Sequence, residues 1–63
     1  MTLTRWCLSI VVDGKRILVG NSPYDPELFE ARCEAVQEKR LWYPERHWRA
    51  RVERVVLTVK GIR

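Results

Sequence analysis

With 63 residues the chain has room for one domain, residues 1–63, and for no cleft between domains. Twelve Lys and Arg against eight Asp and Glu give a net charge of +4, which favours polyanions or acidic protein surfaces as partners. No apolar run approaches the roughly 20 residues that a membrane span needs, and the first residues lack the pattern of a signal peptide. We therefore expect a cytoplasmic protein that does not bind membranes.

Residues 2–12 alternate in a way that predicts a β-strand. Asp13 and Gly14 follow, and this pair is typical of a two-residue type I′ turn, which needs positive φ at both positions. Such a turn pairs Ile10 with Ile17 in a hairpin. The register then assigns side chains to two faces: Trp6, Leu8, Ile10, Val12, Ile17 and Val19 on one, and Arg5, Cys7, Ser9, Val11, Arg16 and Leu18 on the other.

Residues 24–42 carry the signals of one helix. Asp25 is a favourable N-cap, and Pro26 fits the first helical position, where its missing N–H costs nothing. Lys39 and Arg40 suit the last turn, since cations are favoured at a helix C-terminus. A helical wheel places Leu28, Phe29, Cys33 and Val36 on the inner side with Ala31 and Ala35 flanking them, and Glu27, Glu30, Glu34 and Glu38 on the solvent side.

Residues 50–60 predict a third strand, which Gly61 ends. Its apolar residues change phase midway, from even to odd positions. A bulge near Glu53 and Arg54 would keep both apolar sets on the helix side. The outer face would then carry Arg49, Arg51, Arg54, Val56, Thr58 and Lys60.

The predicted element order is strand, strand, helix, strand. A right-handed crossover past the helix places the third strand beside the first. We therefore expect an α+β fold of the ββαβ type, with a three-stranded antiparallel sheet of order 2-1-3. The helix would pack on one face of this sheet and leave the other face open, because no sequence remains to cover it.

The sequence shows no pattern of catalytic or metal-binding residues. Cys7 and Cys33 fall on opposite sides of the sheet, Cys7 half-exposed and Cys33 in the core, so we expect both thiols to stay free. His47 and two scattered cysteines do not make a zinc site, which needs about four ligands in close pairs. We expect a protein that is not an enzyme, with no cofactor, no metal and no small-molecule substrate.

Basic and aromatic residues alternate between residues 39 and 54. Such a mixture suits nucleic acid, and the same residue types are enriched at protein–protein hot spots. For the aromatic residues Trp42, Tyr43 and Trp48 we favour the other interpretation, that they seal the end of a small core. The open sheet face offers no ring for base stacking, which favours a protein partner. The candidate partner-binding residues are Arg5, Arg16, Arg46, Arg49, Arg51 and Arg54.

Residues 52–55 (Val-Glu-Arg-Val) and the aromatic-Pro turn at residues 42–44 carry a family resemblance. With the length and the element order, they resemble very small bacteriophage proteins that inhibit host machinery, in particular the short podovirus inhibitors of bacterial RNA polymerase. The resemblance implies that arginines of the last strand contact an acidic part of the polymerase. It points to Arg54, with Arg51 as a looser match. The Asp-Gly hairpin and the greater basicity depart from that family's pattern.

The expected function is therefore that of a non-enzymatic binding module. It would dock on a larger host protein or complex, such as bacterial RNA polymerase, and inhibit or regulate it, in the host cytoplasm if a phage encodes it. The alternative is a nucleic-acid-binding accessory protein that uses the basic, aromatic-interleaved surface.

Overall fold

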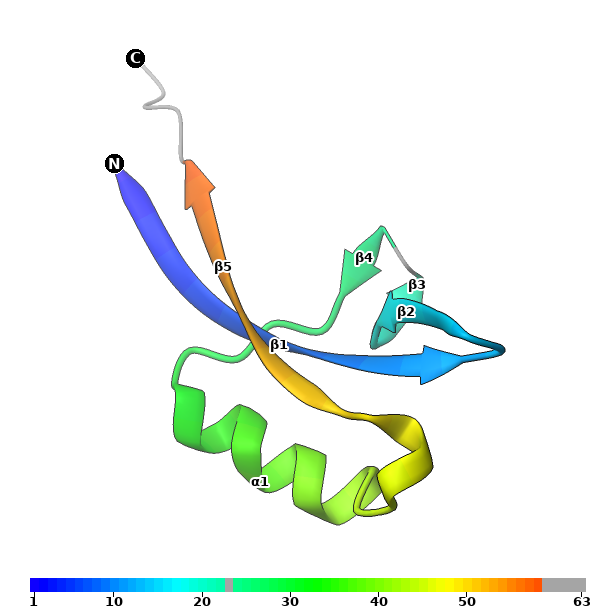
Figure 1. Cartoon of the computed structure of the whole chain (residues 1–63). Helices are drawn as coiled ribbons and strands as arrows, with labels where there is room; N and C mark the ends of the chain where they lie inside the picture. The colour runs from blue at the N-terminus through cyan, green and yellow to red at the C-terminus, as the bar shows by residue number, and fades with distance from the viewer. Residues whose placement is uncertain (23, 59–63) are drawn as a thin grey trace.

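The computed structural model describes residues 1–22 and 24–58. Its three-stranded antiparallel sheet has the order β2-β1-β5, and α1 is the one α-helix of the described residues (Figure 1). This confirms the predicted α+β fold and its strand order. The elements are β1 (Thr2–Val12), β2 (Lys15–Leu18), β3 (Gly20–Ser22), β4 (Asp25–Pro26), α1 (Arg32–Trp42), the 3-10 helix η1 (Arg46–Trp48) and β5 (Arg51–Thr58).

The hairpin between β1 and β2 has the predicted turn and register. Asp13 and Gly14 both have positive φ, 52° and 77°, as a type I′ turn requires. Ile10 pairs with Ile17 in this hairpin, and Val12 pairs with Lys15. The pairing places Ile10 and Ile17 on one face and Ser9, opposite Leu18, on the other.

Beyond β2, a second segment of the chain completes the same edge of β1. The Val19 N–H donates to the Leu8 carbonyl at 2.9 Å, after which the chain leaves to form the short pair β3–β4. It then returns beside β1, where Trp6 and Phe29 exchange two backbone hydrogen bonds of 2.9 and 2.7 Å. Gly20 allows this path, because a Cβ there would lie 2.5 Å from the Asp25 carbonyl oxygen.

The helix begins later than the sequence predicts. Asp25 and Pro26 form β4, and the Asp25 carboxylate accepts from the Asn21 amide at 3.3 Å instead of capping a helix. The following residues stay extended because Phe29 pairs with β1, so α1 starts at Arg32.

This later start also changes which side of the helix is covered. Ala35 is fully buried, whereas Cys33 and Leu28 are exposed and Glu38 is half-buried. The predicted inner side was therefore wrong for Cys33 and Leu28, and the predicted solvent side was wrong for Glu38. The helical wheel had been drawn for a helix of residues 24–42, whereas α1 begins at Arg32.

The predicted bulge in the last strand is absent from the described residues. β1 and β5 pair without interruption from Thr2 opposite Thr58 to Ser9 opposite Arg51. Arg54 consequently lies opposite Trp6, on the other face from Arg51. The predicted bulge assumed that a helix covers the whole strand, but the N-terminal part of β1 and the end of β5 extend beyond α1 as a two-stranded ribbon (Figure 1). The predicted strand end at residues 60 and 61 lies outside the described residues.

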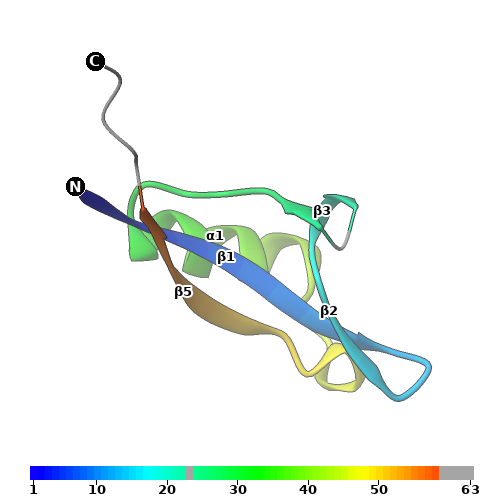
Figure 2. The same ribbon diagram turned by 90° about the horizontal axis from the view of Figure 1, so that it is seen from above.

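The helix packs on the face of the sheet that carries Leu8 and Ile10. These two residues are 3% and 6% exposed, and Tyr43, just after α1, lines a pocket together with Ile10. Seen from above in Figure 2, the sheet lies in front of α1, and no helix of residues 1–22 and 24–58 covers the face toward the viewer. None of the helices in this part of the chain is long and apolar enough to cross a membrane.

Candidate docking face of the sheet

The uncovered face of the sheet, which we call the open face, carries the odd-numbered residues of β1 and their cross-strand partners. Cys7 lies at its centre, opposite Glu53 of β5. On the other edge, the Trp6–Phe29 bridge puts Leu28 next in register beside Cys7. Arg5 precedes Cys7 on the same face and Ser9 follows it. The long side chains around Cys7 are therefore those of Arg5, Glu53 and Leu28.

A hydrogen-bond chain crosses all three strands of this face. The Arg16 guanidinium of β2 donates to the Ser9 hydroxyl at 2.9 Å, and that hydroxyl donates to the Glu53 carboxylate at 2.9 Å. Ser9 is only 1% exposed, so little water competes for its hydroxyl in these two hydrogen bonds. The chain of bonds holds Arg16 and Glu53 in fixed positions over the sheet.

The sequence did not predict this Ser9–Glu53 contact. Glu53 had been placed at a bulge, where its direction could not be stated. An uninterrupted register would have put it on the Ser9 and Cys7 face, because the alternation of a strand fixes the face of every residue. The signal that could have predicted this contact is that Arg51 and Glu53 are both odd-numbered. In an uninterrupted strand they therefore lie on the same face.

The two thiols have the reverse of the predicted exposures. Cys7 is on the open face as predicted, but it is 0% exposed, whereas Cys33 is exposed on α1. Burial of Cys7, and secondly the negative charge of Glu53, raise the pKa of its thiol above the ordinary value. Cys7 is therefore a neutral, covered group rather than a reactive thiolate. Both cysteines are free, and the described residues contain no cluster of potential metal ligands.

Three of the six candidate arginines share the open face. Arg5 is half-buried beside Cys7, and its guanidinium donates to the Thr4 carbonyl at 3.0 Å, while Arg16 and Arg51 are exposed toward the hairpin end. Arg51 pairs with Ser9 across β1 and β5, next to the Arg16 contact. Glu53 is the one acidic residue at the open-face positions of β1, β2 and β5, so this face carries a net positive charge.

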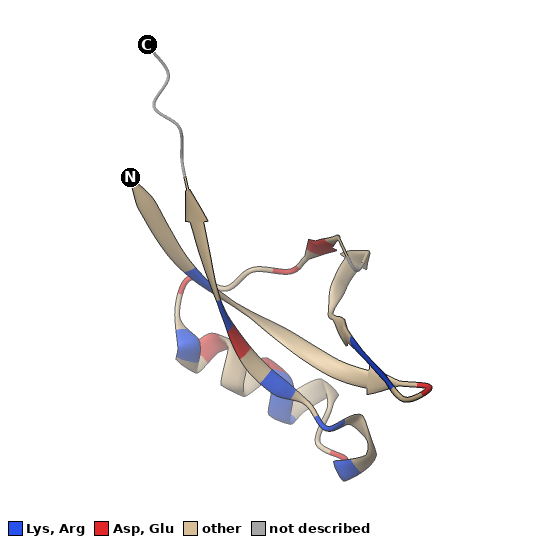
Figure 3. Cartoon of the chain, turned by 45° about the horizontal axis from the view of Figure 1, so that its top comes forward, with Lys and Arg blue, Asp and Glu red and all other residues tan. Residues whose placement is uncertain are grey.

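The other three candidate arginines lie elsewhere. Arg54 is exposed on the opposite face, where Trp6 is its cross-strand neighbour. Arg46 lies in η1, and Arg49 follows it with φ 45° and ψ 44°, a left-handed conformation that costs a non-glycine residue roughly 1–2 kcal/mol. Figure 3 shows the blue segments of η1 and of the start of β5 near one another at the same end of the molecule.

The aromatic residues after α1 divide into a packed pair and an exposed ring. Tyr43 and Trp48 meet edge to face with centroids 5.5 Å apart, and both are half-buried. They close the end of the core, as one of the two interpretations of the sequence expected. Trp42 is 65% exposed and its neighbour Leu41 67%, so these two side chains do not belong to that seal.

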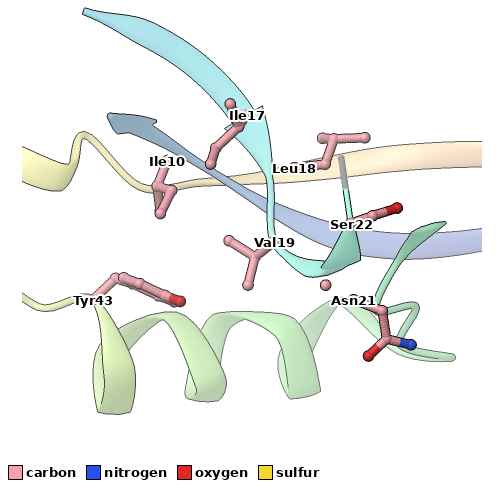
Figure 4. Close-up of a pocket in the computed structure, with 8 residues that line it drawn as sticks. Ile10, Ile17, Leu18, Val19, Asn21, Ser22 and Tyr43 are labelled. Carbon is pink, nitrogen blue, oxygen red and sulfur yellow. The ribbon is translucent and has the colours of Figure 1, made fainter. Parts of the chain in front are cut away.

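A pocket of about 280 Å³ lies beside β2 on the helix side of the sheet (Figure 4). Ile10, Ile17, Val19 and Tyr43 supply side chains to its wall, together with the backbone around Gly20. Its wall contains no carboxylate, imidazole or basic group, so it offers no acid–base pair for catalysis. Leu18, the cross-strand partner of Ser9 on the open face, also borders the pocket.

No protein-family model, curated protein or solved structure matches the chain. A fold of this type supports many functions, so function has to be argued from the residues of the open face and its surroundings.

Proposed function

We propose that the protein is a non-enzymatic binding module that docks on an acidic surface of a larger protein through the open face of its sheet. The observation that carries this proposal is the position of Arg5, Arg16 and Arg51 on one face that no helix of the described residues covers. Complementary charge between such a face and its partner sets the docking orientation and accelerates association.

The apolar content of the same face supports a protein partner. Leu3, Val55 and Leu57 lie half-buried beside the arginines, and Leu28 is 39% exposed at the opposite edge. Interfaces between proteins combine such apolar contacts with arginine anchors, whereas binding to phosphate needs charge alone. No aromatic ring stands among the open-face positions of β1, β2 and β5 on which a base could stack.

In its more specific form, the proposal is that docking inhibits or regulates a host machine such as bacterial RNA polymerase. This form rests on the sequence resemblance described above, which points to Arg54. The register favours Arg51 instead, since Arg54 lies on the other face. These two exposed arginines of one strand therefore form a matched pair for a charge-reversal test.

The test uses the purified protein as bait in a lysate treated with nuclease, followed by binding measurements on the identified partner. Arg51→Glu should abolish binding, because a truncated hot-spot arginine costs about 2 kcal/mol or more and a wrong-sign charge adds repulsion. Arg54→Glu should weaken binding less than Arg51→Glu does, because Arg54 does not lie on the open face. Melting temperatures of both variants show whether the fold is kept. Loss of binding in Arg54→Glu alone would reject the open face in favour of the family-like contact.

Nucleic acid remains the second candidate because Trp42 is exposed beside basic residues. Its ring is 65% exposed, and Arg40 and Arg46 on either side of it in sequence are exposed as well. Exposed rings among cations suit single strands. Titration with single-stranded DNA and RNA over a salt series separates the two functions: under this alternative, Trp42→Ala weakens binding and each lost arginine lowers the salt slope by about one.

A further inference from the structure

The outer edge of β5 presents a row of backbone hydrogen-bonding groups. Trp6 uses both its N–H and its carbonyl to bond Phe29, so even-numbered residues of β1 turn their backbone away from β5. In an antiparallel ladder the odd-numbered residues of β1 then bond β5, through partners such as Glu53 and Val55. The even-numbered residues of β5 therefore turn N–H and C=O to the outer edge: Val52, Arg54, Val56 and Thr58.

The described residues place nothing against this edge. β5 is an end strand of the order β2-β1-β5 and runs for eight residues, from Arg51 to Thr58. Edge strands are commonly protected by proline, by a bulge or by being short. β5 contains no proline, pairs without a bulge and has Val56 56% exposed. Only the charges in its first half limit which strand can add to it.

Two of the registers that a second copy could take set like charges against each other. An antiparallel pair of two β5 strands centred on residue 53 or 54 places Glu53 or Arg54 opposite its own copy, whereas centring on Val52 places Arg51 opposite Glu53. Like charges directly opposite one another are destabilising. The net charge of +4 adds repulsion between two whole molecules. The edge suits a partner of the opposite sign.

We propose that the β5 edge binds an extended acidic segment of a partner protein as an additional antiparallel strand. This inference rests on the proposed function and specifies its geometry, because Arg51 lies both on the open face and next to the edge. Backbone hydrogen bonds would provide affinity, and side chains at alternate positions would provide specificity. The segment should carry carboxylates opposite Arg51 and Arg54 and apolar residues opposite Val52 and Val56.

The probe is a synthetic hexapeptide with the sequence Val-Val-Glu-Thr-Val-Glu, which matches residues 56 to 51 in antiparallel order. Its controls are the same peptide with both Glu replaced by Lys, and the same peptide with N-methyl groups on the edge-facing amides. Binding of the acidic peptide alone, in calorimetry and in amide shifts of β5, is the expected result. Equal binding of the lysine peptide or of the N-methylated peptide would overturn the proposal.

The protein variants are Val56→Pro and Val56→Ala. Proline removes the outward N–H and leaves the ladder to β1 intact, since residue 56 and its partner Thr4 form a pair that is not hydrogen-bonded. Val56→Ala removes the same exposed side chain and keeps the N–H. We expect Val56→Pro to lower peptide affinity by about tenfold or more, and Val56→Ala to change it by less than about threefold, at similar melting temperatures.

The same variants distinguish failure of this inference from failure of the proposed function. One outcome is that Arg51→Glu no longer binds the identified partner while Val56→Pro binds it like the wild type. Docking on the open face then stands, and strand addition is wrong. If both Arg51→Glu and Val56→Pro bind like the wild type, the proposed function is wrong as well. Dimerisation of the free protein that Val56→Pro abolishes would assign the edge to a second copy, against the proposal.

Discussion

The two faces of β1 bury their side chains by different means. Leu8 and Ile10 face α1, whereas Cys7 and Ser9 face the side without a helix, yet Cys7 and Ser9 are the less exposed, at 0% and 1%. A low exposed fraction here does not identify the core. On the helix side it reflects packing between two layers, and on the open face it reflects small side chains between long ones in a single layer.

The difference follows from side-chain size. A thiol or a hydroxyl needs only its nearest neighbours to lose contact with water. Glu53 of β5 flanks Cys7 on one side, and Leu28 of the segment bridged to β1 flanks it on the other. A leucine needs a surface above it, which Ala35 helps to supply by letting α1 approach the sheet closely. Burial on the helix face should therefore contribute more stability than equal burial on the open face.

The largest expected effect is that of Leu8→Ala on the helix face. Deleting a buried leucine side chain costs about 2–5 kcal/mol, which in so small a domain brings the protein close to unfolding. Cys7→Ala, on the adjacent and less exposed residue, should cost about 1 kcal/mol or less. Urea unfolding of both variants measures the difference. Equal losses would mean that the open face is part of the core.

A smaller effect is expected from Ser9→Ala, which removes the central hydroxyl of the hydrogen-bond chain. Arg16 loses an acceptor and Glu53 loses a donor, and bonds to charged groups contribute about 1.5–3 kcal/mol at most. We expect a loss of about 1–2 kcal/mol, because both charged groups can regain water at the open face. Thr58→Ala, at an exposed hydroxyl of the same sheet, should stay within about 0.5 kcal/mol. A Ser9→Ala variant as stable as Thr58→Ala would show that the chain of bonds does not stabilise the sheet.

The smallest effect is a pH dependence that comes from Cys7. Burial and Glu53 raise the pKa of this thiol in the folded protein, so the unfolded chain loses the thiol proton first as the pH rises. The stability that Cys7 contributes is full below the pKa of the unfolded thiol and is lost between that value and the higher pKa of the folded one. The free energy of unfolding of the wild type, minus that of Cys7→Ala, should decline above about pH 9. A flat difference would show that the thiol is solvated.

Local signals predicted the part of the fold that a turn determines. The Asp13–Gly14 pair fixes the hairpin register by itself, and with it the face of Arg5 and Arg16. The helix start was not predictable from Asp25 and Pro26, because residues that favour a helix N-terminus also occur beside tight turns, and here they form β4 of a short hairpin. Tertiary pairing of Phe29 with Trp6 decided between them.

The candidate site was predicted in part for a similar reason. Arg51 falls on the open face with or without a bulge, so its assignment did not depend on that feature. Arg54 changes sides when the bulge is removed, and Glu53 then has a defined side. No local pattern distinguishes a bulge from a strand that extends past its helix. The contact between Ser9 and Glu53 requires the β1–β5 register, which joins distant parts of the chain.

The central position of β1 also has a consequence for how fast the protein folds. β1 is the first strand in the chain, and its longest ladder is with β5, the last, in pairs such as Thr2 with Thr58. The hairpin with β2 is local and can form in about 1–10 μs, but the ladder with β5 requires the closure of most of the chain. Proteins dominated by such distant pairings fold in milliseconds to seconds. Despite its small size, this protein should therefore fold slowly, with β1 exposing an unpaired edge until β5 arrives.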